Sequence, residues 1–152
     1  MVAGGVALDL LTKQAALARL LPHDPVAVAP SINLTLGFNA GVAFGLAPAE
    51  SPMGTALLLL VQSGLVAMLA WFLARAPHME GRVAFGLLIA GALGNMLDRV
   101  PDGLVTDFID LYWRNWRWPA FNVADILICL GVALLILSPR AQAMSDSKRS
   151  AS

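Results

Sequence analysis

The chain has 152 residues, of which 58% are hydrophobic and only 13% are charged, and its formal net charge is zero. A soluble domain carries about 25% charged residues, so this composition favours a protein whose solvent is largely lipid. The zero net charge argues against a nucleic-acid partner, and the single cysteine excludes a disulfide framework and a thiolate metal cluster.

The first apolar segment, residues 2–21, carries Asp9, Lys13 and Arg19. We interpret its first part as a membrane helix and the rest as leaving the bilayer. At about 1.5 Å per residue, the residues before Lys13 reach roughly 18 Å, against a hydrocarbon core of about 30 Å. We therefore expect that Met1 lies inside the natural reading frame and that the protein begins upstream.

The segment 22–52 is rich in Pro, Gly and Asn and predicts a small strand element at the extracytoplasmic interface. Residues 51–74 carry no charge and predict the clearest transmembrane helix. The uncharged stretches 83–97 and 126–138 reach spanning length only if a bounding carboxylate, Asp98 or Asp125, lies at membrane depth. Ionisable groups there are costly and are therefore functional candidates.

Residues 100–119 combine tryptophans with arginines and predict a segment that lies in the headgroup layer. The expected fold is an all-α membrane protein with four transmembrane helices, a small extracytoplasmic β element and this interfacial segment. We expect one domain over residues 1–140 and a polar, disordered tail at 141–152. Lysines and arginines divide equally between the two sides, so charge alone leaves the orientation open.

Several acidic residues fall at the same ends of the predicted helices. Two carboxylates close together in a poorly solvated site cannot both ionise easily, so one acts as a base and its neighbour as an acid. Aspartic proteases work in this way, with no metal, cofactor or covalent intermediate. The candidates are Asp9, Asp98, Asp107, Asp110 and Asp125.

Five short motifs occur in a fixed order along nearly the whole chain. They are DLLTK at 9–13, NLT at 33–35 with NAGVAFG at 39–45, GNMLDR at 94–99, VTDFID at 105–110 and FNVAD at 121–125. Together they resemble the signature motifs of the lipoprotein signal peptidases (signal peptidase II), an aspartyl peptidase family. The sequence departs from the family pattern at Ala40 and Ile126, which follow motif residues but remove no catalytic group.

The resemblance implies a role for each matching residue. Asp107 and Asp125 match the catalytic pair, which we call the dyad. The substrate-binding positions are Asn39, Gly41, Asn95, Arg99 and Asn122. The supporting positions are Asp9, Lys13 and Asp98, with Asp98 expected to orient Arg99 by a charge-assisted hydrogen bond. No metal site is implied.

The family removes the signal peptide from bacterial prolipoproteins, just before a cysteine that carries diacylglycerol. The resemblance thus implies diacylglyceryl prolipoprotein substrates, contact with membrane lipid, no cofactor and a monomer. It also implies a multi-pass protein of the cytoplasmic (inner) membrane with its active site near the outer face. A small transporter or proton-relay subunit is the alternative, because it too would place acids at membrane depth.

Plainer structural readings stay open for several of these residues. Asp9 and Lys13 match an i,i+4 ion pair at a helix end. Asn39 and Gly41 match a turn. Asp110 fits a solvated or structural acid better than a catalyst. The tryptophans at 113–118 fit an interface anchor.

Overall fold

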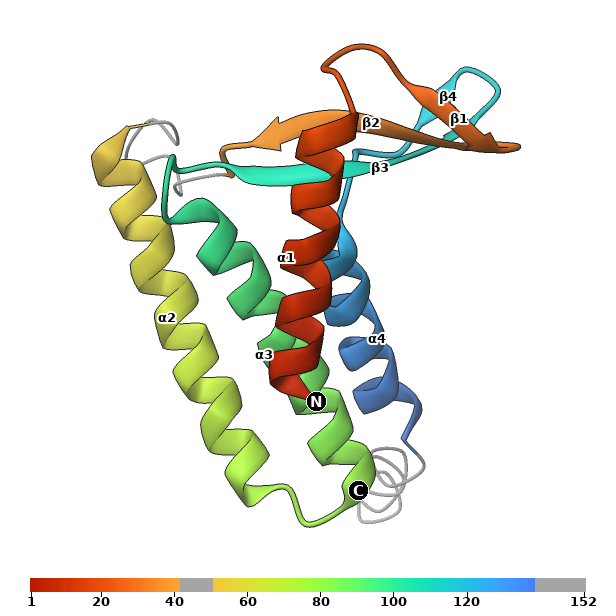
Figure 1. Ribbon diagram of the computed structural model, residues 1–152. Coiled ribbons are helices and arrows are strands. Elements are labelled where there is room, and N and C mark those ends of the chain that lie inside the picture. Colours follow the sequence, from red (N-terminus) through yellow and green to blue (C-terminus); the bar gives the residue numbers. More distant parts are fainter. Residues whose placement is uncertain (42–50, 139–152) are drawn as a thin grey trace, which may run out of the picture.

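The computed structural model describes residues 1–41 and 51–138, which form four helices and one small sheet. The expected tail at 141–152 and residues 42–45 of the second motif lie outside this range. The helices run side by side and the sheet lies across one end of them (Figure 1). They are α1 (Val2–Arg19), α2 (Pro52–Arg75), α3 (Met79–Arg99) and α4 (Val123–Leu137).

Helix α2 is the one helix of the described residues that is both long and apolar enough to cross a membrane. Its N-cap is Ser51, whose side chain accepts a hydrogen bond from the backbone N–H of Gly54 at 3.0 Å, and Pro52 is its first residue. Helix α4 is apolar but has only 15 residues. Helix α1 continues without interruption to Arg19.

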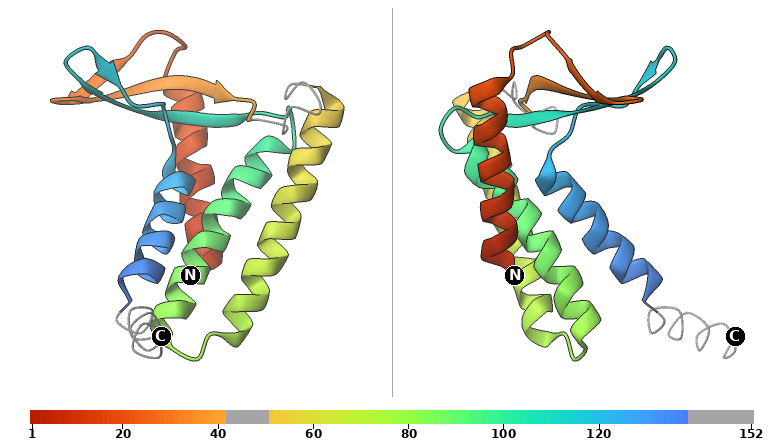
Figure 2. Two further views of the ribbon diagram at one scale, coloured as in Figure 1. Left: turned by 180° about the vertical axis from the view of Figure 1, so that it is seen from behind. Right: turned by 45° about the vertical axis from the view of Figure 1, so that its right-hand side comes forward.

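The sheet is antiparallel, in the order β1-β2-β3-β4, and extends sideways past the helices (Figure 2). Its strands are β1 (Val26–Ala29), β2 (Ile32–Asn39), β3 (Val105–Trp113) and β4 (Trp116–Arg117). The strand element expected within residues 22–52 is confirmed. The term all-α is wrong, because the segment 100–119, expected to be only interfacial, supplies half of the same sheet.

Two features explain why β3 escaped prediction. Its partner β2 lies about 70 residues earlier in the chain, with pairing from Ile32 opposite Leu111 to Asn39 opposite Val105. Its first four residues are all buried, so the strand lacks the inside–outside alternation that marks a half-buried strand.

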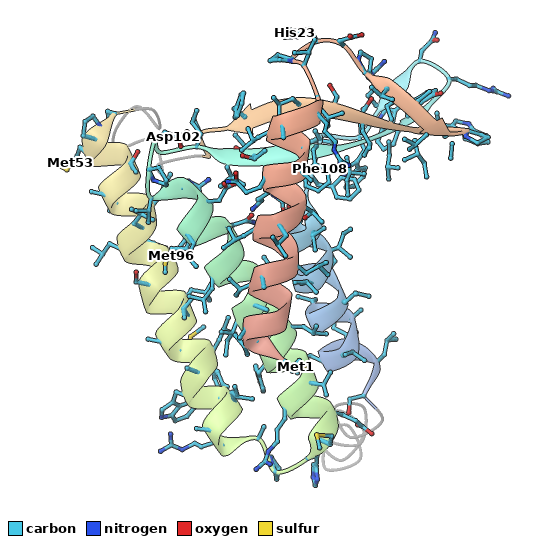
Figure 3. The ribbon with its side chains drawn as sticks, in the orientation of Figure 1. Met1, His23, Met53, Met96, Asp102 and Phe108 are labelled. Atoms are coloured by element: carbon cyan, nitrogen blue, oxygen red, sulfur yellow. The ribbon has the colours of Figure 1, made fainter. Side chains whose placement is uncertain are left out.

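Helix α3 is the centre of the bundle and packs against α1, α2 and α4. Glycines allow α3 to approach α1 and α4 closely. A Cβ on Gly94 would lie 2.5 Å from a carboxylate oxygen of Asp9, and one on Gly131 would lie 2.8 Å from Leu88. Figure 3 places Phe108 where β3 passes the end of α1, and Met1 at the opposite end of that helix. The polar residues of three helices and β3 therefore meet at the sheet end of the bundle.

Candidate active site

Asn122 links the two carboxyl groups of the dyad. It is the N-cap of α4, where its Oδ1 accepts from the backbone N–H of Asp125 at 3.1 Å and its own N–H donates to Asp125 Oδ2 at 3.1 Å. This reciprocal pair is a capping box. The Asn122 Nδ2 group donates to Asp107 Oδ1 on β3 at 2.7 Å. One fully buried residue thus bonds both carboxyl groups, through its side-chain amide to Asp107 and through its backbone N–H to Asp125.

Asp107 is poorly solvated, with only 5% of its surface exposed. Burial, together with the charge of Asp125, raises the pKa of Asp107 to about 6, although hydrogen bonds from the Asn122 and Asn39 amides oppose the rise. At pH values below about 6 the Asp107 carboxyl is therefore largely protonated. A carboxylic acid in this state is able to donate a proton.

Asp125 is held from the other side by α1 and α3. Its Oδ1 accepts from Asn95 Nδ2 at 2.9 Å, and Asn95 Oδ1 accepts from Lys13 Nζ at 2.8 Å. The same ammonium lies 2.8 Å from Asp9 Oδ2 and 3.3 Å from Asp98 Oδ2. Lys13 and Asp9 are fully buried, so this i,i+4 pair is part of the interior polar network.

The other supporting carboxylates hold the backbone around the dyad. Asp9 Oδ1 accepts from the backbone N–H of Ala124 in the first turn of α4 at 2.8 Å. Asp98 Oδ2 accepts from the backbone N–H of Thr106 at 2.7 Å, one residue before the dyad carboxyl of β3. Among the described residues, Asp98 therefore bonds β3 and Lys13 in place of the expected bond to Arg99.

Arg99 connects α3 with two other elements. Its Nη1 donates to Gln62 Oε1 of α2 at 3.3 Å, and its Nη2 donates to the carbonyl of Asn39 at 3.4 Å. Its Nε is buried with no hydrogen-bond partner among the described residues. The Asn39 side chain accepts from the N–H of Gly41 at 2.8 Å, so the turn expected here is present. Gly41 has φ +72°, a conformation that favours glycine.

The structure brings every predicted site residue into one connected set at the sheet end of the bundle. Asp110 lies apart, buried, where it accepts from Arg117 at 2.6 Å and from Asn33 at 3.2 Å. It is thus a structural acid and not a solvated one. Our sequence reasoning missed Gln62 and Thr106. The signal for Gln62 was available, because it is the only amide side chain in the uncharged stretch 51–74.

Two cavities open beside the dyad, one at each carboxyl group. A cavity of about 420 Å³ is lined by residues 37–41, Asp107, Pro119 and Ala120. A cavity of about 490 Å³ is lined by Leu111, Trp118, Phe121, Asp125, Ile126, Cys129, Leu130 and Ala133. The described residues contain no group of three or more His, Cys, Asp or Glu side chains placed to hold a metal ion.

Two carboxyl groups that differ in environment and are bonded by the same residue have the arrangement of an aspartic peptidase. Comparison with known proteins leads to the same class of enzyme. The family described as signal peptidase (SPase) II matches residues 1–139. The chain therefore belongs to the signal peptidase II family of aspartic peptidases.

Individual relatives cover most of the chain. It is 40% identical over 136 residues to the lipoprotein signal peptidase of Syntrophotalea carbinolica, covering 88% of this chain and 84% of that protein. It is 42% identical over 134 residues to the lipoprotein signal peptidase of Actinobacillus succinogenes, covering 86% and 81%. A solved bacterial membrane enzyme has a similar fold, with a TM-score of 0.79 at 31% identity, covering 90% of this chain and 88% of that one.

Proposed function

We propose that the protein is an integral membrane endopeptidase that removes the signal peptide from diacylglyceryl-modified bacterial prolipoproteins, cleaving before the lipidated cysteine. The observation that carries the proposal is that one residue, Asn122, bonds the carboxyl groups of both Asp107 and Asp125, the first with its side-chain amide and the second with its backbone N–H. Family membership supplies the substrate class, since the relatives are named lipoprotein signal peptidases. We further propose that all four helices cross the cytoplasmic membrane, with the sheet at the outer face.

The two carboxyl groups take different roles. Both oxygens of Asp125 accept hydrogen bonds, from Asn95 and Asn122, and the N-terminus of α4 favours an anion. We therefore assign the role of base to Asp125. Asp107, whose pKa is raised to about 6, carries the proton and is the acid.

The reaction balances with these two groups and one water. Asp125 takes a proton from the water as the water oxygen attacks the scissile carbonyl carbon, while Asp107 gives its proton to the carbonyl oxygen. The tetrahedral species then collapses. The C–N bond breaks, the leaving amine takes the proton held by Asp125, and the hydroxyl proton returns to Asp107, which restores the resting enzyme.

The substrate backbone binds in the cavity beside Asp107. This cavity is lined by the backbone of residues 37–41, which offers polar groups to an extended peptide. Arg99 donates to the carbonyl of Asn39 and so holds this segment in place. Asn39, Gly41 and Arg99 are thus substrate-positioning residues.

The test is cleavage of a diacylglyceryl peptide by the purified protein and by Asp107→Asn and Asp125→Asn variants. Each variant should fold yet lose at least about 100-fold in kcat/KM, because acid and base are both required. Asp102→Asn is the matched control, since Asp102 is exposed in the loop between α3 and β3 (Figure 3), where it accepts from the backbone N–H of Leu104. Activity within tenfold of wild type in either dyad variant contradicts the assignment.

A further inference from the structure

The buried carboxylate of Asp110 joins side chains from two different strands. Asp110 lies on β3 with 4% of its surface exposed. Its Oδ2 accepts from Asn33 Nδ2 of β2 at 3.2 Å and from Arg117 Nη1 of β4 at 2.6 Å. Asn33 is itself buried and lies directly opposite Asp110 in the register of β2 and β3, whereas the Arg117 side chain is 61% exposed. We call these three residues the clamp.

The clamp is separate from the polar network of the dyad. Within the described residues, no side-chain hydrogen bond links it to Asp107 or Asp125. A buried ion pair adds little net stability compared with apolar residues of the same size, because desolvation of the two charges offsets their attraction. Stability alone is therefore a weak reason for this pair, and what it holds in place is the better guide to its role.

The two strands that the clamp holds lead to the two walls of the cavity beside Asp107. Strand β2 continues from Asn33 to the wall formed by residues 37–41. Arg117 is the last residue of β4, and residues 119–120, which follow it closely, form the opposite wall. Strand β3 lies between β2 and β4 in the sheet. The width of the cavity therefore depends on how both strands are held against β3.

The wall at residues 119–120 is held only at its two ends. Before it, the Trp118 N–H donates to the Leu111 carbonyl at 2.9 Å. After it, Phe121 and Ile109 exchange backbone hydrogen bonds at 2.9 and 3.0 Å. Residues 119–120 make no backbone–backbone hydrogen bond of their own within the described part of the chain. The position of this wall thus depends on the contacts that flank it, and the clamp is one of them.

We propose that Asn33, Asp110 and Arg117 are positioning residues that set the width of the cavity beside Asp107, and with it the size of the side chain accepted next to the scissile bond. This inference rests on the proposed function, which places the substrate backbone in that cavity. Because one carboxylate holds both walls, loss of either partner frees one wall while the dyad keeps its own bonds. The effect therefore falls on binding and selection of the substrate more than on the chemical step.

Arg117→Met provides the test, because it removes the cation but keeps an apolar stem near the Tyr112 ring. The substrates are two diacylglyceryl peptides that differ only in the residue before the lipidated cysteine, which is alanine or leucine. The variant should raise KM for the alanine peptide by about fivefold or more and keep kcat within about twofold of wild type. The kcat/KM of the leucine peptide relative to the alanine peptide should rise by about threefold or more, because a freed wall admits a larger side chain.

Two further variants separate positioning from other effects. Arg117→Lys should recover most of the wild-type KM and preference, since Asp110 is bonded by one guanidinium nitrogen and an ammonium can take its place. Arg114→Met removes the other cation of the same hairpin, which is exposed and makes no ion pair within the described residues, and should change neither quantity. An equal change in Arg114→Met, or a lower thermal midpoint in Arg117→Met with KM and preference unaltered, overturns the proposal.

A double variant covers the case in which Arg117→Met folds poorly because the Asp110 carboxylate is left without its cation. Asp110→Asn combined with Arg117→Met has no buried charge but still lacks the ion pair. It should show the same rise in KM and the same shift in preference as Arg117→Met, because both single changes break one interaction. Wild-type kinetics in the double variant, or additive effects of the two changes, contradict the clamp. Absence of cleavage of both peptides by wild type would instead overturn the proposed function.

Discussion

Asn122 bonds two carboxyl groups whose proton affinities must differ for catalysis, Asp107 with its side-chain amide and Asp125 with its backbone N–H. The pKa of Asp107 is raised to about 6 by burial and by the nearby Asp125 charge. Because the acid must be protonated, kcat/KM should fall by about tenfold per pH unit above that pKa. A pH–rate profile on a diacylglyceryl peptide measures this decline. A flat profile from pH 5 to about pH 9 would contradict the role of Asp107 as the acid.

The side-chain amide of Asn122 should set the pH at which kcat/KM begins to decline. Asn122 donates to Asp107, and this hydrogen bond lowers the pKa of the carboxyl group. Asn122→Ser keeps a good N-cap for α4 but removes the amide donor. The alkaline midpoint should therefore move to higher pH, whatever happens to the maximal rate. A midpoint that is unchanged or lower would show that Asn122 acts only as a helix cap.

The raised pKa also has a consequence for stability. A group whose pKa is higher in the folded state contributes stability that is present at low pH and is lost as pH rises through about 6. Asp107→Asn has no charge to bury, so its thermal midpoint should exceed that of wild type at pH 8. The difference should vanish near pH 4. A variant that is less stable than wild type at both pH values would refute this linkage.

Lys13 is a fully buried cation that contacts Asp9, Asp98 and Asn95. Removing one member of a buried ion pair typically costs about 3–5 kcal/mol, because the partner charge stays unpaired. Lys13→Met should therefore lower the thermal midpoint sharply and reduce cleavage. Adding Asp9→Asn should recover part of the stability. If the double variant is no more stable than Lys13→Met, the coupling between these charges is absent.

At the level of residues, the motifs indicated the polar side chains that the structure brings together, while their catalytic and binding roles stay predictions. They could not predict the bonds. Asp9 and Ala124 are 115 positions apart, and nothing local to either residue predicts that the carboxylate bonds the first turn of α4. Asp98 adjoins Arg99 in sequence but bonds Thr106 of β3, because the strand passes above the end of α3.

Among the elements, close approach of α1, α3 and α4 depends on small residues. A methyl group on Gly94 would displace the Asp9 carboxylate, which bonds α4. Gly94→Ala should therefore cost about 1–3 kcal/mol of stability, as overpacking usually does, and should lower kcat. Gly64→Ala is the control, since its added methyl group has nothing within 4 Å and alanine favours a helix. Equal thermal midpoints for the two variants would contradict the packing argument.

The helices were the more predictable elements, because uncharged runs such as 51–74 mark them directly, and α2 occupies Pro52–Arg75. The sheet was only half predictable. Turn residues and β-branched residues marked β1 and β2, but β3 depends on pairing with β2 over a long sequence separation. Its aromatic and basic end was interpreted from composition alone as an interfacial segment.

On the scale of the whole molecule, α2 stands apart. Among the described elements it packs against α3 alone, and its exposed apolar faces are suited to lipid. Its polar link to the site is Gln62, which accepts from Arg99. Arg99 also donates to the Asn39 carbonyl at the end of β2. One guanidinium thus joins α2, α3 and the sheet beside the dyad.

Lysine should not be able to replace Arg99 in this position. A planar guanidinium donates in two directions at once, whereas an ammonium on a flexible stem is a point charge. Arg99→Lys should therefore keep the fold but lose about tenfold or more in kcat/KM, because the end of β2 loses its fixed position against α2. Arg75→Lys is the matched control, since Arg75 lies at the far end of α2 over the Trp71 ring, 4.1 Å from its centroid. Kinetics on the lipidated peptide, with thermal midpoints for both variants, test the role, and wild-type activity in Arg99→Lys would show that the charge alone suffices.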